Sequence, residues 1–297
     1  MKSSFPRLTA ALCLVLFLTA CSPRLMVLDG VADELSSQSG GDEADLDLAR
    51  EASAFYLKLS ESILRQNPAH QRLAESVSAG FTQYAYAFVA FEAEQVENKD
   101  ARSAERLRQR AARLYQRAHT HALRALTQGD PAFLPALRSA RAADWPLLKP
   151  AQVGLAYWAA AAWGGWISLS KDEPDVVADL PLAIRLAELA WAVDPAWGNG
   201  ALSSLLGTFE SARPGGRLLR ARDYFDQGLV QAGGHSAGAY LAKAEGYALP
   251  TGDRAAFEEL LTQALAVKDE AASPLALQNE VMRRRARWLQ EKTAELF

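Results

Sequence analysis

The chain has 297 residues, of which 49% are hydrophobic and 23% are charged, and its formal net charge is -3. A chain of this length and composition can bury a large apolar core without disulfides or a structural metal. The small acidic excess disfavours nucleic acid as a partner, because proteins that bind phosphate backbones usually carry a strong basic excess.

Residues 1–20 are predicted to be a lipoprotein signal peptide. Two basic residues precede an apolar stretch from Leu8 to Ala20, and acidic residues are absent from this region, as in secretory signals. The stretch is shorter than the roughly 20 apolar residues that a membrane-spanning helix needs. The sequence Leu18-Thr19-Ala20-Cys21 resembles a bacterial lipobox. This resemblance implies cleavage before Cys21 and acylation of its thiol, palmitate being one of the acyl groups.

Lipidation at Cys21 would leave the folded domain without a free thiol, because the other cysteine, Cys13, belongs to the predicted signal peptide. Several acyl chains on one cysteine anchor a protein stably to a bilayer. We therefore expect a periplasm-facing protein that lipid holds to the cell envelope. Ser22 follows the cysteine, which in lipoproteins favours the outer membrane, with the inner membrane as the alternative.

The rest of the chain is predicted to be all-helical. Residues 21–47 contain the stretch Ser36–Gly41, rich in serine and glycine, and we expect them to form a flexible tether before a domain spanning 48–297. In the domain, apolar residues recur at spacings of three and four, which is typical of amphipathic helices. Gly and Pro residues separate the predicted helices. These helices cover 44–66, 69–98, 102–126, 150–170, 179–193, 199–212, 217–231, 236–248, 253–266 and 274–296.

One pair of helices fits the spacing of a tetratricopeptide repeat (TPR), in which small residues let two helices pack closely. Leu206 and Gly207 fit the first helix, and Ala221, Phe225 and Gly228 take the small, aromatic and small positions of the second. Other segments keep this spacing loosely. We therefore expect stacked antiparallel helix pairs in a degenerate TPR-like α-solenoid, an architecture that offers a concave face and an inner channel for a partner or ligand.

Motifs for catalysis, metal binding or cofactor binding do not stand out. His119 and His121 are two residues apart, whereas a zinc pair on one helix needs a spacing of four. The sequence also lacks a phosphate-binding glycine loop and a nucleophile elbow. We therefore expect no catalytic residue, no metal and no cofactor. A hydrolase whose site is assembled from scattered residues remains an alternative.

The uncharged stretch from Val153 to Leu169 predicts a helix that is buried on all sides. Its aromatic residues, interspersed with alanine and glycine, allow two interpretations: a plain aromatic core or the wall of a ligand pocket. The second interpretation adds polar and aromatic residues from the neighbouring segments. The candidate ligand-binding residues are then Gln83, Tyr84, Tyr86, Tyr157, Trp163, Trp166 and Lys171.

Four segments of the chain together resemble one known family. They are the lipobox, the segment Gly80–Phe88, the run Tyr157–Asp172 and the ending Arg284–Leu289. These segments are similar to the TatT family, the T-components of tripartite ATP-independent periplasmic (TRAP) transporters. The likeness extends from about Ala52 to Phe297.

This resemblance implies an all-helical, TPR-like lipoprotein that forms a homotrimer and binds the solute-binding P-component of the transporter. The implied task is accessory: the protein brings solute-binding subunits together and holds or passes a small ligand, for which a hydrophobic character is one option. The resemblance implies no catalytic residue. The runner-up interpretation is a generic outer-membrane TPR lipoprotein that organises envelope or cell-wall assembly.

Overall fold

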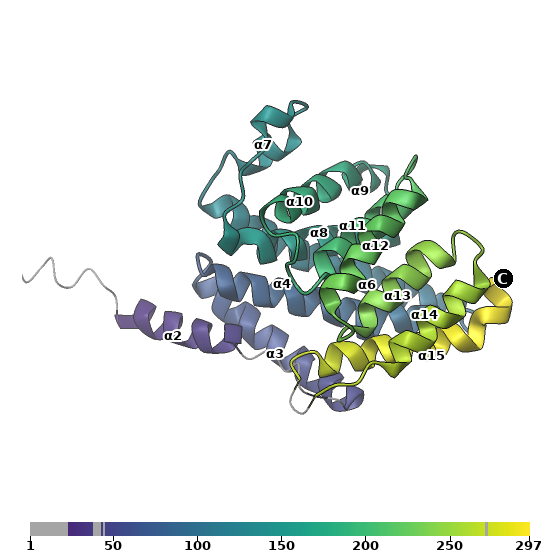
Figure 1. Cartoon of the computed structure of the whole chain (residues 1–297). Coiled ribbons are helices and arrows are strands. Elements are labelled where there is room, and N and C mark those ends of the chain that lie inside the picture. Colours follow the sequence, from purple (N-terminus) through teal and green to yellow (C-terminus); the bar gives the residue numbers. More distant parts are fainter. Residues whose placement is uncertain (1–22, 38–42, 44, 271–272) are drawn as a thin grey trace, which may run out of the picture.

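The computed structural model describes residues 23–37, 43, 45–270 and 273–297 (Figure 1). In this part of the chain every regular element is helical, as the hydrophobic periodicity predicts. Within the same residues we find no helix with the length and hydropathy of a membrane span. The predicted signal peptide and Cys21 lie outside the described residues.

The helix bounds agree with most of the sequence predictions. The structure adds α2, α7 and α9, which were not predicted, and it places a π-helical segment inside two predicted helices, 69–98 and 236–248. The α-helices are α2 (Pro23–Ser37), α3 (Leu46–Gln66), α4 (Gln71–Ala85), α5 (Phe91–Val96), α6 (Ala101–Gln128), α7 (Phe133–Arg138), α8 (Val153–Leu169), α9 (Pro174–Val177), α10 (Leu180–Val193), α11 (Ala201–Ala212), α12 (Leu218–Ala232), α13 (Ala237–Lys243), α14 (Arg254–Ala266) and α15 (Ala276–Leu296). The π-helical segments are η1 (Tyr86–Ala90) and η4 (Ala244–Ala248), and the 3-10 helices are η2 (Ala142–Asp144) and η3 (Pro150–Gln152).

Aspartate side chains determine where three of these helices begin. Asp45, Asp100 and Asp253 each accept a hydrogen bond from a backbone amide in the first turn of α3, α6 and α14, respectively. The first amides of a helix have no carbonyl partner within it, so a capping carboxylate stabilises the helix start.

Helix α2 lies within the predicted tether 21–47 and packs against α3 and α4. Ala32 is fully buried in this contact and Leu35 is 8% exposed. The hydroxyl of Tyr56 donates a hydrogen bond to the carbonyl of Leu35. The helical part of the predicted tether is therefore folded onto the domain that it precedes.

Helix α8 contacts α4, α6 and α10, and these four helices form the centre of the molecule (Figure 1). Nine residues of α8 are buried, Leu155 among them, whereas Ser168 near its end is exposed, so the predicted helix forms and is buried over most of its surface. Two glycines bring the neighbouring helices close to α8. A Cβ atom at Gly164 would lie 2.6 Å from the ring of Phe209, and one at Gly165 would lie 2.7 Å from the ring of Tyr115.

Helices α11 and α12 pack against each other through the small residues that the TPR spacing predicted. Ala221 and Phe225 are fully buried. A Cβ atom at Gly207 would lie 2.7 Å from the ring of Phe225, and one at Gly228 would lie 2.6 Å from the Ser204 hydroxyl. The absence of these Cβ atoms therefore allows the two helices to approach closely.

Helix α15 connects two apolar cores. Val281, near its start, belongs to the main core, whereas Ala286 and Leu289 pack with α13, η4 and α14 in a second core. The helix also contacts α3, and the ring of Trp288 meets the ring of Phe91 from α5 edge-on. The last helix of the chain thus returns to its first helices (Figure 1).

Candidate functional site

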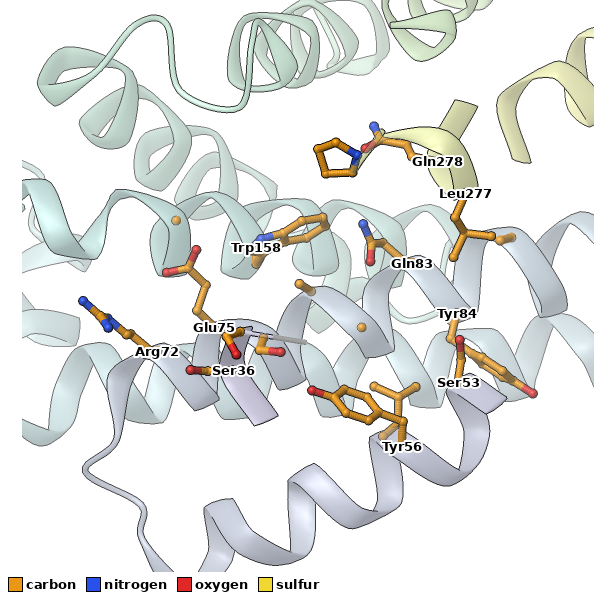
Figure 2. Close-up of a pocket in the computed structure, with 18 of the residues that line it drawn as sticks. Ser36, Ser53, Tyr56, Arg72, Glu75, Gln83, Tyr84, Trp158, Leu277 and Gln278 are labelled. Atoms are coloured by element: carbon orange, nitrogen blue, oxygen red, sulfur yellow. The ribbon is translucent and has the colours of Figure 1, made fainter. Parts of the chain in front are cut away.

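A cavity of about 1200 Å³ is lined by residues of α2, α3, α4, α8 and α15 (Figure 2). Helix α4 contributes residues along most of its length, and the loop before α11 contributes Trp197. Aromatic rings make up much of the apolar part of the lining. They are Tyr56, Tyr84, Tyr86, Phe88, Trp158 and Trp197.

Tyr86, the residue directly after α4, connects this part of the cavity wall to the part formed by α15. It is the first residue of the π-helical segment η1, and such segments locally widen a helix. Its hydroxyl donates a hydrogen bond to Sδ of Met282 at 3.8 Å. Burial raises the pKa of Tyr86 and outweighs the opposing effect of the nearby Arg285. The phenol is therefore neutral and remains a hydrogen-bond donor.

Glu75 is a cavity-lining carboxylate that has no hydrogen bond or ion pair with another described residue. It lies against the start of α8, where a Cβ atom at Gly154 would overlap its carboxylate. Burial raises the pKa of Glu75. By contrast, Asp33 on the same lining lies 3.2 Å from Nε2 of His70.

The structure brings three of the predicted ligand-binding residues together. Gln83, Tyr84 and Tyr86 all line the cavity, and Figure 2 shows Gln83 projecting from α4 toward the side of the cavity that carries Trp158. Their roles in binding remain a prediction.

The other predicted residues do not line this cavity. Trp163 is 2% exposed, and its ring packs on that of His119 at a centroid distance of 4.3 Å. The ring centroid of Trp166 lies 6.2 Å from that of His119. Tyr157 packs on the ring of Trp197 at 4.4 Å, and Lys171 is exposed. Trp163 and Trp166 therefore belong to an aromatic cluster around His119.

The lining residues that were not predicted from the sequence include Glu75, Trp158 and Trp197. Helical spacing could have identified Glu75, because Glu75, Ala79 and Gln83 are four residues apart and share one face of α4. All three line the cavity. Trp197 comes from a loop between α10 and α11, and local spacing carries no signal for its position.

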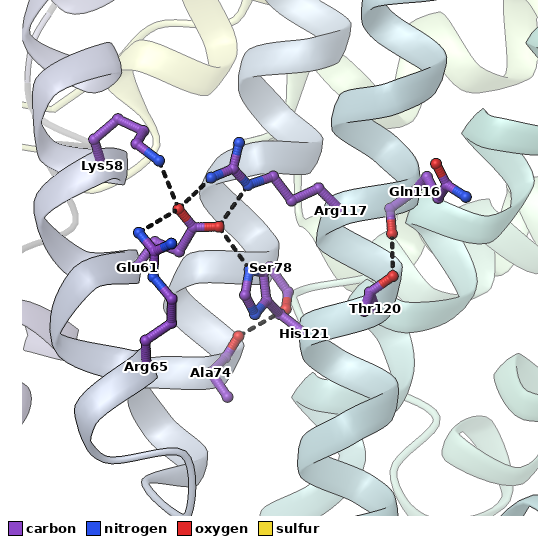
Figure 3. A network of polar contacts seen from close by, with 9 residues as sticks. All are labelled: Lys58, Glu61, Arg65, Ala74, Ser78, Gln116, Arg117, Thr120 and His121. Atoms are coloured by element: carbon purple, nitrogen blue, oxygen red, sulfur yellow. Dashed lines mark hydrogen bonds and ion pairs between the residues drawn. The ribbon is translucent and has the colours of Figure 1, made fainter.

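A second polar centre, outside the cavity, joins α3 to α6 (Figure 3). The carboxylate of Glu61 accepts hydrogen bonds from Arg117, from Lys58 at 2.8 Å and from His121 at 2.9 Å. Arg65 lies 3.5 Å away. Burial alone would raise the pKa of Glu61, but the hydrogen bonds from Arg117, Lys58 and His121 outweigh it and lower the pKa to about 2. Glu61 is therefore ionised and ties the two helices together.

A third polar centre surrounds Arg285 of α15, whose side chain is 11% exposed. Its guanidinium lies 2.7 Å from Glu245 and 3.0 Å from Glu94, and 5.7 Å from the centroid of the Tyr86 ring. Burial would lower the pKa of Arg285, but the surrounding acidic groups raise it further above its ordinary value. Both π-helical segments contribute to this centre, η1 through Tyr86 and η4 through Glu245.

The histidines in the described ranges do not form a metal site. Nδ1 of His119 lies 3.3 Å from the carbonyl oxygen of Ala159, and burial lowers the pKa of His119 to about 4 despite this hydrogen bond. His121 contacts Glu61 instead. Within these ranges, no group of three or more His, Cys, Asp or Glu residues could hold a metal ion.

Two comparisons with known proteins bear on this chain. Residues 42–297 match the model of a family described as TRAP transporter T-component. The chain is also similar to a protein of Treponema pallidum (strain Nichols) that carries the name "Uncharacterized protein". The two are 27% identical over 266 residues, which cover 86% of this chain and 81% of the relative. The family match includes most of the cavity wall.

Proposed function

Because this chain belongs to the family of TRAP transporter T-components, we propose that it binds the solute-binding P-component of such a transporter and holds or passes a small ligand. The family is a class of transporter components and not a class of enzymes. The observation that carries the ligand-handling proposal is the cavity of about 1200 Å³ at the junction of five helices. A space of this size accommodates a small organic molecule.

The composition of the lining supports ligand handling. Aromatic rings supply apolar contact area, and Gln83, Glu75 and Gln278 supply a few polar groups. Small-ligand sites combine these two elements, since apolar burial supplies affinity and a small number of polar groups fixes the orientation of the ligand. In this proposal the chain breaks no bonds, and ion gradients across other subunits drive uptake.

We also propose that the chain is a lipoprotein anchored through Cys21 to the cell envelope, at the outer membrane and facing the periplasm. The lipobox at Leu18–Cys21 supports this. Replacement of Cys21 by Ser is expected to abolish incorporation of labelled palmitate and to move the protein from the membrane fraction to the soluble fraction. An unmodified amino terminus upstream of Cys21, found by mass spectrometry of the wild type, would contradict the proposal.

The domain organisation and assembly complete the proposal. Residues 1–20 are the signal peptide, 21–47 link the lipid to the domain, and 48–297 form a degenerate TPR-like stack. The close packing of α11 on α12 through Gly207 and Gly228 supports the TPR-like arrangement. We propose a homotrimer, which sedimentation of the purified protein can test directly.

The central experiment is co-elution with the P-component encoded beside this chain. The purified chain, mixed with that P-component, is expected to elute as one complex from a size-exclusion column. A solute-binding protein from an unrelated ATP-driven importer serves as the control and is expected to elute separately. Separate elution of the cognate P-component, together with capture of cell-wall assembly proteins from the envelope, would instead support a generic envelope scaffold.

A further inference from the structure

The charges and rings of the cavity identify the class of ligand that it fits, an inference that rests on the ligand-handling function proposed above. We propose that the cavity binds an organic cation, namely an ammonium compound with an apolar part. Glu75 supplies the negative counter-charge, and the ring of Trp158 covers the ammonium group.

The first observation is that the Glu75 carboxylate has no partner among the described residues. Other carboxylates removed from solvent in the described structure are paired: Glu61 with Arg117, and Glu210 with Arg213. Glu75 is partly buried and has neither a hydrogen bond nor an ion pair within the described chain. Removing an ionised carboxylate from water without giving it a partner costs free energy. A ligand ammonium group would remove this cost, and burial already raises the pKa of Glu75 in its absence.

The second observation is that the Glu75 carboxylate lies beside an aromatic wall. It rests against Gly154, and Trp158 follows Gly154 by four residues on α8. Residues four apart share one face of a helix, so the carboxylate and the Trp158 ring belong to the same wall of the cavity. Figure 2 shows both side chains on this side of the cavity.

A second tryptophan extends this wall. The ring of Trp197 meets the ring of Trp158 nearly at a right angle, with a centroid distance of 6.5 Å and an interplanar angle of 85°. Both rings line the cavity. Tryptophan faces attract ammonium groups through their quadrupole, and aromatic rings beside a carboxylate suit a quaternary ammonium in particular.

The third observation is the charge of the lining. The lining includes three carboxylates, those of Asp33, Glu34 and Glu75. Among the described residues it includes one basic side chain, that of Arg72. Arg72 is exposed, and Figure 2 shows its side chain directed away from Trp158. A lining with an excess of negative charge concentrates cations and disfavours organic anions.

Binding of two matched probes tests the proposal. Benzyltrimethylammonium and benzoate carry the same ring and opposite charges, and each is titrated calorimetrically into the full chain in a non-ionic detergent at neutral pH. The expected result is that the cation binds and benzoate does not compete with it. Replacement of Glu75 by Gln is expected to weaken cation binding at least tenfold. Glu51→Gln, the same change at an exposed position of α3, is the control and is expected to leave the affinity unchanged.

Three outcomes would overturn the proposal: tighter binding of benzoate than of the cation, a Glu75→Gln affinity within twofold of the wild type, or no binding of either probe. Circular dichroism verifies that the variants fold. If Glu75→Gln does not fold, the preference of the wild type for cation over anion and a loss of affinity in Trp158→Leu decide the question. The co-elution experiment with the P-component is independent of these results, so the two proposals can fail separately.

Discussion

Glu61 of α3 and Arg117 of α6, 56 residues apart in the sequence, form a two-point ion pair in which Nε and Nη2 of the arginine face the two carboxylate oxygens (Figure 3). The Glu61 side chain is 4% exposed and that of Arg117 is 36% exposed. The same guanidinium lies 4.8 Å from the ring centroid of Phe81 on α4. One arginine therefore connects three helices and neutralises a buried carboxylate.

Replacement of Glu61 by Gln is expected to destabilise the protein by about 2 kcal/mol, because hydrogen bonds to a charged group contribute roughly 1.5–3 kcal/mol each and the amide retains part of the network. Urea denaturation followed by circular dichroism measures the difference. The matched control is Glu51→Gln on the exposed face of α3, where surface substitutions usually stay within about 0.5 kcal/mol. Equal stability of the two variants would show that the Glu61 network contributes nothing.

The contribution of Glu61 to stability is expected to depend on pH. Its pKa in the folded protein is about 2, below the ordinary value of 4.5, so the folded state favours the ionised carboxylate. The stabilisation is therefore fully present above pH 4.5 and is lost as the pH falls toward 2. The difference in the free energy of unfolding between the wild type and Glu61→Gln, measured from pH 7 down to pH 2, is expected to shrink across this window. A difference that stays constant would contradict the assigned pKa.

Trp163 and Trp158, five positions apart on α8, are expected to respond differently to truncation. Trp163 is 2% exposed against His119, so Trp163→Ala is expected to cost about 3–5 kcal/mol, as for other large core aromatics. Trp158 lines the cavity, and Trp158→Ala is expected to cost less stability but to weaken ligand binding. Thermal unfolding and probe titration of both variants measure the two effects. A ligand-binding defect in a stable Trp163→Ala protein would assign Trp163 to the ligand site instead.

The contact between α8 and α6 at Gly165 is expected to be sensitive to a single methyl group. In Gly165→Ala the new Cβ atom would lie 2.7 Å from the Tyr115 ring, and overpacking of this kind costs about 1–3 kcal/mol. Gly129→Ala is the matched control, because a Cβ atom there meets nothing within 4 Å. Urea denaturation compares the two variants. Similar stability of both would indicate that α6 and α8 can move apart at little cost.

Helical spacing predicted most of the helices because each apolar stripe lies within one short segment of chain. Helix α2 was not predicted, because the serine and glycine residues from Ser36 to Gly41 are typical of a flexible tether. Leu28, Ala32 and Leu35 nevertheless follow the helical period, and the last two are buried. These three residues carry the signal from which the helix can be predicted.

The cavity could be predicted in part. The face of α4 that carries Gln83 and Tyr84 lines it, but the sequence alone could not distinguish Trp158, which lines the cavity, from Trp163, which packs in the core. Helix α8 is apolar on all sides, so periodicity does not indicate which side faces which neighbour. The walls from Trp197 and Leu277 depend on packing between segments that are distant in the sequence.

The return of α15 to the N-terminal helices has a consequence for how the protein unfolds. In an open helical array each unit contacts only its neighbours, so the terminal units can fray or be deleted one at a time. Here Arg285 pairs with Glu94, and α15 also contacts α3. The last helix therefore contacts both early and late helices of the domain, and loss of α15 would also remove one wall of the cavity. We therefore expect the domain to unfold in one cooperative step and not helix by helix from its end.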